Sequence, residues 1–292
     1  MNPKLKKSLV TALKITVSLS LMIWVLSKLD WIQIGRVFRE ANVFYFLAAV
    51  VFFIASQFVS VSRFNIFVRT AGIRISFWTN SQLYLLGMFY NFFIPGGIGG
   101  DAYKAYMLSK AYKKSLKSLG KIVFLDRFVG LVAIGFAICV MLAFVEIPHY
   151  NYLKWIFIVL GILGTAIILR YTHKFFHTHK KRILIGFIYS VLVQGLQILS
   201  VWCIMNSFDV QGDAFIYLVM FLVSSVLSII SFAGLGIREA VFYYGAHWFN
   251  FDEDISAVIA FSFSIMTMAV SFLGVIYLFK QIPLGKTHEN QA

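Results

Sequence analysis

Charged residues are scarce in this sequence, making up only 13% of its 292 residues, roughly half the share of an average soluble chain. Hydrophobic residues account for 60%. Several uninterrupted apolar runs reach the ~20 residues that a helix needs to cross a bilayer. These features exclude a water-soluble enzyme and predict an all-α polytopic membrane protein.

Cysteines and acidic residues are also few. The two cysteines, Cys139 and Cys203, each lie inside an apolar run, so we expect small core residues rather than a disulfide or a metal site. Twelve acidic residues oppose 26 basic ones, for a net charge of +14. In a soluble chain this charge would suggest nucleic acid, but in membrane proteins Lys and Arg collect on the cytoplasmic side. We expect no nucleic-acid partner, cofactor or metal.

Six apolar runs are long enough to be full spans, and we predict them at residues 8–26, 43–62, 121–145, 153–170, 183–205 and 255–279. The first run follows a basic start and lacks a signal-peptide cleavage site, so a retained leading helix is expected within 1–30. Two further apolar segments, 77–109 and 214–250, are interrupted near their middles by glycines and charges.

The lysines that follow the first interrupted segment predict its topology. If 77–94 crossed outward, six lysines would reach the exterior, against the positive-inside rule. We therefore predict that 77–109 is a re-entrant hairpin entering from the cytoplasm and that 214–250 enters from the outside. Both termini of this multi-pass cell-membrane protein are then cytoplasmic. The cytoplasmic side holds 20 Lys and Arg, Arg63 among them, and the exterior holds eight of the twelve acids.

The order span, hairpin, span occurs twice, over 43–145 and 183–279. In the predicted topology the copies run in opposite directions, with 153–170 as a connecting span and 280–292 as a cytoplasmic tail of the single domain 1–292. Inverted repeats with broken helices are typical of transporters whose substrate site lies between the repeats. A duplicated unit with purely structural hairpins would show the same order.

Glycines mark the break in each hairpin, Gly97, Gly99 and Gly100 in the first and Gly234 and Gly236 in the second. A half-helix that begins after such a break carries about half a positive charge and free N–H donors, which together can bind carboxylate or phosphate. Glycine also lets the backbone come close to that group. We therefore predict that these glycines bind substrate.

The membrane-embedded segments contain five charged residues: Asp101, Asp126, Arg127, Arg238 and Glu239. An unpaired charge at a helix centre costs about 2.5–3.5 kcal/mol, so each needs a partner or water. One interpretation pairs Arg127 with Glu239 and Arg238 with Asp101, which would only hold the hairpins in place. In the other, both arginines bind an anionic headgroup and the acids position them. Lys104, one turn after Asp101, would be a further phosphate contact.

Two other polar clusters carry less chemistry. His173, His177 and His179 lie in a basic loop without a cysteine or carboxylate nearby, which favours a solvated segment facing anionic lipid over a metal site. Residues 252–254 are three acids in a row, as in some glycosyltransferases, but we expect a solvated exterior turn.

Three stretches carry a family resemblance: N-F-F-I-P-G-G-I-G-G-D-A-Y-K-A-Y over 91–106, D-R-F over 126–128 and G-L-G-I-R-E-A over 234–240. They resemble the membrane domain shared by lysyl-phosphatidylglycerol synthase/flippases and their stand-alone relatives. The resemblance implies a flippase-like fold with re-entrant helices. Asp126 stands where the family often has Glu. No soluble aminoacyl-transferase domain is recognised after Lys286, so we expect that the chain does not itself make lysyl-lipid.

The resemblance implies an anionic or aminoacylated lipid, or a polyprenyl-phosphate-linked sugar, as cargo. Our first hypothesis is therefore a lipid flippase, a transporter rather than an enzyme, whose partner is a membrane lipid with a phosphate headgroup. Two alternatives stay open: a membrane-embedded glycosyltransferase-like enzyme acting on a polyprenyl phosphate, with Asp101 or Glu239 as base, and an accessory subunit of a lipid-modifying enzyme. Assembly as a homo-oligomer also stays open.

Overall fold

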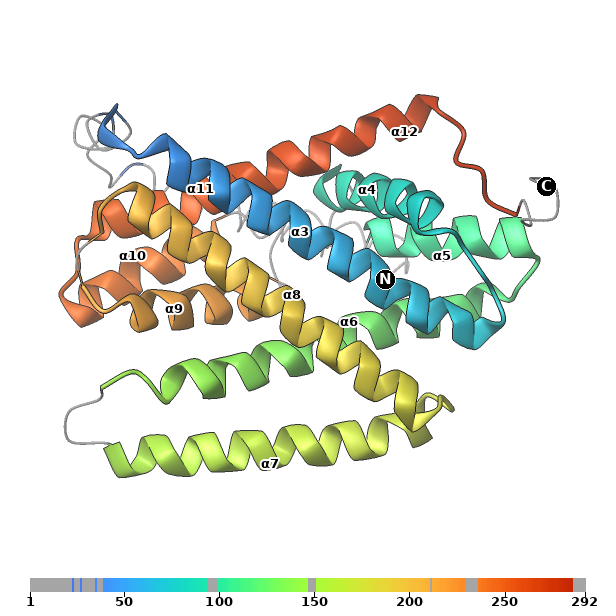
Figure 1. The fold of residues 1–292 in the computed structure, drawn as a ribbon, viewed down its shortest axis with the longest axis horizontal. Helices are drawn as coiled ribbons and strands as arrows, with labels where there is room; N and C mark the ends of the chain where they lie inside the picture. The colour runs from blue at the N-terminus through green and yellow to red at the C-terminus, as the bar shows by residue number, and fades with distance from the viewer. Residues whose placement is uncertain are drawn as a thin grey trace, which may run out of the picture.

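The computed structural model describes residues 23, 27, 35, 39–93, 99–146, 151–210, 212–228 and 236–285, and these form an all-helical bundle (Figure 1). Its helices are α3 (Val43–Val68), η1 (Arg69–Ala71), α4 (Phe77–Phe93), α5 (Gly99–Tyr112), α6 (Leu116–Leu142), α7 (Asn151–Phe175), α8 (Lys180–Ser207), α9 (Ala214–Leu227), α10 (Ile237–Phe249), α11 (Glu253–Phe272), η2 (Leu273–Val275) and α12 (Ile276–Phe279).

Among the described residues, five helical stretches are long and apolar enough to cross a membrane. They are Val43–Ala71, Leu116–Leu142, Tyr152–Phe175, Lys180–Ser207 and Glu253–Phe279. They match five of the six predicted spans and confirm an all-α, multi-pass membrane protein. The predicted span 8–26 lies outside the described residues, apart from residue 23.

Side-chain caps fix where three of the helices begin. Asn42, Asp213 and Asp252 each accept a backbone N–H from the first turn of α3, α9 and α11 respectively. Such a cap satisfies a donor that the helix itself leaves without a partner. The acidic triplet 252–254 is therefore the capped start of α11. Within the described residues, no group of three or more His, Cys, Asp or Glu side chains could hold a metal ion.

α3 and α8 pack along their whole lengths and form the central seam of the bundle (Figure 1). Polar contacts along the seam include Asn42 N to Ser207 O at 2.8 Å, Ser200 Oγ to Ala49 O at 2.8 Å and Arg63 Nη1 to Ser190 Oγ at 3.1 Å. As the residue number rises along α3, the partner's number falls along α8. The two helices are therefore antiparallel.

Two shorter helical hairpins, α4–α5 and α9–α10, enter the bundle from opposite ends of this seam (Figure 1). The end of α5 returns to the start of α4, where Tyr112 Oη donates to the carbonyl of Arg74 at 3.5 Å. The end of α10 returns to α9, where the rings of Phe251 and Tyr217 stack 4.8 Å apart. Their helices have 13 to 17 residues, so each is about 20–26 Å long and shorter than the ~30 Å hydrocarbon core.

The helices form two units with the same order: α3 to α6, and α8 to α11 with its continuation η2 and α12. Their packing is reciprocal. The last helix of the first unit, α6, packs on the hairpin helix α9 of the second, and α11, η2 and α12 pack on the hairpin helix α4 of the first. The remaining span, α7, lies at the periphery against α6 and α8 (Figure 1).

The two ends of the bundle differ in charge. At the end where α3 finishes and α8 begins lie Arg69, Arg74, Lys110, Lys113, Lys114, Lys117, Arg170, Lys174, Lys180, Lys181 and Arg182. We call this the basic end. At the opposite end lie Glu40, Glu146, Asp209, Asp213, Asp252, Glu253 and Asp254. The charge separation predicted for the two sides of the membrane is thus present between the two ends of the bundle.

Candidate functional site

The first hairpin is built on a close crossing of two glycines. A Cβ atom on Gly100 would lie 1.7 Å from the carbonyl oxygen of Gly87, so only glycine fits at the start of α5. Asn91 Oδ1 accepts the backbone N–H of Gly100 at 2.8 Å. This donor is therefore used within the hairpin, and Gly99 is buried beside it. Gly97 lies outside the described residues.

The crossing places Asp101 between two cations. Its Oδ1 lies 3.1 Å from Lys104 Nζ, and its Oδ2 accepts a hydrogen bond from Arg127 Nε on α6. Lys104 is fixed further by the ring of Tyr84, whose centre is 4.0 Å from Nζ. The Asp101 and Lys104 side chains are buried, whereas Arg127 keeps 46% of its side chain exposed. One carboxylate facing two cations leaves this cluster with one positive charge.

Asp126 precedes Arg127 but faces a different partner, because adjacent residues of a helix point about 100° apart. Arg63 on α3 binds both of its carboxylate oxygens, Nε to Oδ1 at 2.8 Å and Nη2 to Oδ2 at 3.0 Å. The third guanidinium nitrogen donates to Ser190 on α8. This fork-to-fork pair is buried and closed.

The sequence-based position of Arg63 was wrong. It was expected in a cytoplasmic loop after a span ending at residue 62, but α3 continues to Val68 and carries Arg63 inside the bundle. Phe64 and Phe67 explain the extension, because both are buried in the apolar core at the basic end. These phenylalanines were the sequence signal that could have revealed Arg63 as a further embedded charge.

The second hairpin has its own polar cluster at the start of α10. Gly236 adopts a φ of +81°, in the region that favours glycine, and its N–H donates to Glu239 Oε2 at 2.7 Å. Ser264 on α11 joins the two charged residues of α10. Its hydroxyl donates to Glu239 Oε1 at 2.7 Å and accepts from Arg238 Nη1 at 3.0 Å. Gly234 lies outside the described residues.

Arg238 is buried and only partly satisfied. Its guanidinium carbon lies 4.9 Å from the ring centre of Phe263, and within the described residues its Nε has no hydrogen-bond partner. A buried donor without an acceptor costs about 1–3 kcal/mol. An oxygen acceptor brought to this nitrogen would therefore be stabilised.

The predicted pairing of Arg127 with Glu239 and of Arg238 with Asp101 is wrong. Arg127 binds Asp101, and Arg238 binds Ser264. The cause lies in the packing, since α5 packs on α6 and α10 packs on α11. A charged residue at the start of each hairpin's second helix therefore meets the span that follows it within its own unit.

The predicted site residues in the described part of the chain thus fall into three groups. These are Gly99, Gly100, Asp101, Lys104 and Arg127 at α5 and α6; Asp126 with Arg63; and Gly236, Arg238 and Glu239 at α10. The backbone N–H groups of Gly100 and Gly236 are each held by a side chain of their own hairpin. These two donors are therefore occupied within the hairpins.

Comparison with known proteins places this arrangement in a family. A family model described as the lysylphosphatidylglycerol synthase TM region matches residues 11–278, which include all three motifs and both hairpins. No curated protein gives a significant match. The family relates the chain's function to membrane lipids. The chain belongs to the family of lysylphosphatidylglycerol synthase transmembrane regions.

Proposed function

We propose that this chain is a lipid flippase that moves a lipid with a phosphate headgroup between the leaflets of the cell membrane. The cargo is an anionic or aminoacylated phospholipid or a polyprenyl-phosphate-linked sugar. The observation that carries the proposal is the cluster around Asp101, where one carboxylate faces Lys104 and Arg127. A phosphate oxygen added at the exposed side of Arg127 would bring the cluster to neutrality.

The arrangement of the helices supports transport. The leading helices α3 and α8 are antiparallel, and the two units pack on each other reciprocally, as expected for inverted repeats related by a two-fold axis in the membrane plane. In this proposal the short hairpins are re-entrant, one from each leaflet. Transporters of this construction hold their substrate between the repeats. The basic end faces the cytoplasm, in accord with the positive-inside rule.

Each of the two units places one arginine for the phosphate. Arg127 offers a partly exposed positive charge to the phosphate, and Arg238 offers its unsatisfied Nε. Arginine suits both roles because its planar fork matches phosphate oxygens and stays charged at any physiological pH. When no cargo is present, Asp101 holds Arg127, and Ser264, which donates to Glu239, holds Arg238. The acyl tails remain in lipid.

The test is a scrambling assay in proteoliposomes with headgroup-labelled phosphatidylglycerol, comparing the wild type with Arg127→Gln and Arg238→Gln. Removing one charge-assisted bond to the phosphate should slow transfer about tenfold or more. Arg170→Gln is the matched control, since Arg170 is an exposed arginine at the end of α7; it should transfer lipid at the wild-type rate. Unfolding temperatures in detergent check that the variants are folded.

Equal rates for the wild type and both site variants would contradict the proposal, as would the absence of transfer of any phosphate lipid by the wild type. Analysis of the lipid after the assay separates the alternatives. A new covalent product would identify an enzyme. Unchanged lipid, with no transfer until a lipid-modifying enzyme is added, would identify an accessory subunit.

A further inference from the structure

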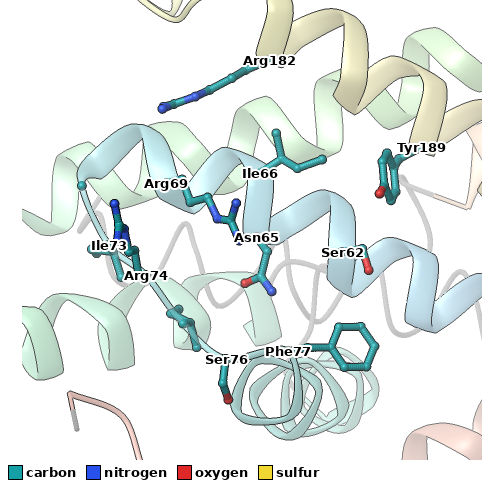
Figure 2. A pocket seen from close by; sticks show the side chains of 12 residues that line it. Ser62, Asn65, Ile66, Arg69, Ile73, Arg74, Ser76, Phe77, Arg182 and Tyr189 are labelled. Atoms are coloured by element: carbon teal, nitrogen blue, oxygen red, sulfur yellow. The ribbon is translucent and has the colours of Figure 1, made fainter. Parts of the chain in front are cut away.

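A second basic site lies away from the embedded charges, in a hollow of about 980 Å³ at the basic end of the bundle. Its walls come from the last two turns of α3, from the linker between α3 and α4, and from the first turns of α8. Figure 2 shows Arg182 and Tyr189 reaching in from α8, on the side opposite Ser76 and Phe77. None of its lining residues belongs to the clusters around Asp101 and Arg238.

The hollow is positively charged and uncompensated. Arg69, Arg74 and Arg182 line it, and no acidic residue does. Among the described residues, none of these three arginines forms an ion pair. Asp101 on α5 and Asp126 on α6 are bound by other cations. Three arginines that line one hollow without a carboxylate make it a favourable place for an anion.

The rest of the lining suits a phosphate ester. Ser62, Asn65 and Tyr189 also line the hollow, and the side chains of Asn65 and Tyr189 can donate hydrogen bonds. Apolar side chains, including Ile66 and Phe77, complete the walls. An arginine fork binds two phosphate oxygens at once, and the hydroxyl and amide groups match the polar part of a headgroup. The apolar walls would accept the first carbons of an acyl chain.

We propose that this hollow binds one phosphate-bearing anion at the basic end of the bundle, held by Arg69, Arg74 and Arg182. Two sources carry this chemistry: the headgroup of an anionic phospholipid in the adjacent leaflet, and a soluble phosphate. The inference concerns binding alone and does not depend on transport. Its failure therefore leaves the flippase proposal standing, and the reverse also holds.

The experiment counts bound lipid on the full-length protein by native mass spectrometry from nanodiscs that contain phosphatidylglycerol and phosphatidylcholine. The test variant is the triple substitution Arg69→Gln, Arg74→Gln and Arg182→Gln. The control is Lys114→Gln, Lys117→Gln and Lys121→Gln. It removes the same charge from exposed lysines that do not line the hollow.

The wild type should retain one phosphatidylglycerol in preference to phosphatidylcholine. The arginine variant should lose about tenfold or more in affinity, because several charge-assisted hydrogen bonds are removed. The lysine control should change less than about twofold. Equal losses in the two triple variants would reduce the effect to general surface charge and overturn the site, and so would wild-type binding by the arginine variant. Unfolding temperatures, which should be alike because all six residues lie at the surface, show that loss of binding is not loss of fold.

A second arm identifies the source of the phosphate. Inorganic phosphate is titrated into the detergent-solubilised wild type, and displacement of phosphatidylglycerol is measured. If inorganic phosphate displaces phosphatidylglycerol only when the phosphate concentration is far above the lipid concentration, the result supports a lipid site whose apolar walls contribute to binding. Binding of phosphate that is equally tight with and without lipid, and that the arginine variant loses, assigns the site to a soluble phosphate. The absence of both ligands from the wild type overturns the proposal.

Discussion

Two consecutive residues of α6, Asp126 and Arg127, form ion pairs of opposite character. Asp126 is enclosed by Arg63 through two hydrogen bonds, and both side chains are 8% exposed. Arg127 shares Asp101 with Lys104 and stays 46% exposed. A closed pair, with every charge matched, serves to fasten α3 to α6. A cluster with two cations for one carboxylate and with an exposed arginine is unsuited to holding two helices together. It is suited to exchanging one partner for another.

The largest effect is expected for Asp126→Asn, which would leave the Arg63 guanidinium buried without its counter-charge. This variant tests whether the closed pair stabilises the fold. We expect the free energy of unfolding to fall by about 3–5 kcal/mol, measured by thermal or denaturant unfolding in detergent. The double variant Arg63→Met with Asp126→Leu should recover much of this loss, since both charges are then absent. A single variant as stable as the wild type would show that the pair does not fasten the fold.

Gly100→Ala tests the support of the Asp101 cluster. The added methyl group would collide with the carbonyl of Gly87, and such overpacking should destabilise the protein by about 1–3 kcal/mol. The control is Gly120→Ala on α6, where a Cβ would meet nothing within 4 Å. The control should keep its stability or gain a little. Equal unfolding temperatures for the two variants would mean that the α4–α5 crossing is looser than described.

Arg127→Gln should cost little stability, about 1 kcal/mol or less, because the side chain is half exposed and Asp101 retains Lys104. The same variant should lose lipid transfer, so activity and unfolding temperature separate at this position. Asp126→Asn should affect both together. If Arg127→Gln unfolded as readily as Asp126→Asn, the distinction between the two contacts would disappear.

The smallest effect is expected at the solvent-accessible pair of His247 and Glu253, whose ring Nδ1 and carboxylate oxygen lie 2.6 Å apart at the end of the bundle opposite the basic end. His247→Gln should change the free energy of unfolding by no more than about 0–1 kcal/mol. Measured in the same detergent, this variant gives the smallest change in the free energy of unfolding with which the other variants are compared. A larger loss would show that contacts at this end bear more of the stability than their exposure suggests.

The fold class was predictable because it depends on the length of apolar runs. Five predicted spans coincide with long apolar helices, and each segment that glycines and charges interrupt contains two short helices, α4 and α5 in the first and α9 and α10 in the second. The partners of the charged residues were not predictable in the same way. They depend on helix rotation and on which helices pack together, which a single sequence does not specify.

Individual residues show where this limit lies. Arg63 was misplaced because a charge was taken to end a span, although the buried Phe64 and Phe67 continue it. Gly100 was predicted from its place at a helix break, but the close backbone of Gly87, which leaves no room for a Cβ at Gly100, could not be read from the sequence. The hydroxyl of Ser264 could not be found from sequence, because nothing in an apolar helix distinguishes it from the other serines of α11.

The antiparallel contact between α3 and α8 also limits how the protein can move. Sliding one helix lengthwise past the other would break the backbone hydrogen bond between Asn42 and Ser207 and the bond from Ser200 to Ala49. Rotation of the other helices about the common axis of α3 and α8 leaves both hydrogen bonds intact. The α3–α8 pair is therefore expected to stay fixed as a unit. If the proposed substrate site opens to one leaflet and then to the other, the hairpins and outer spans must move relative to this pair.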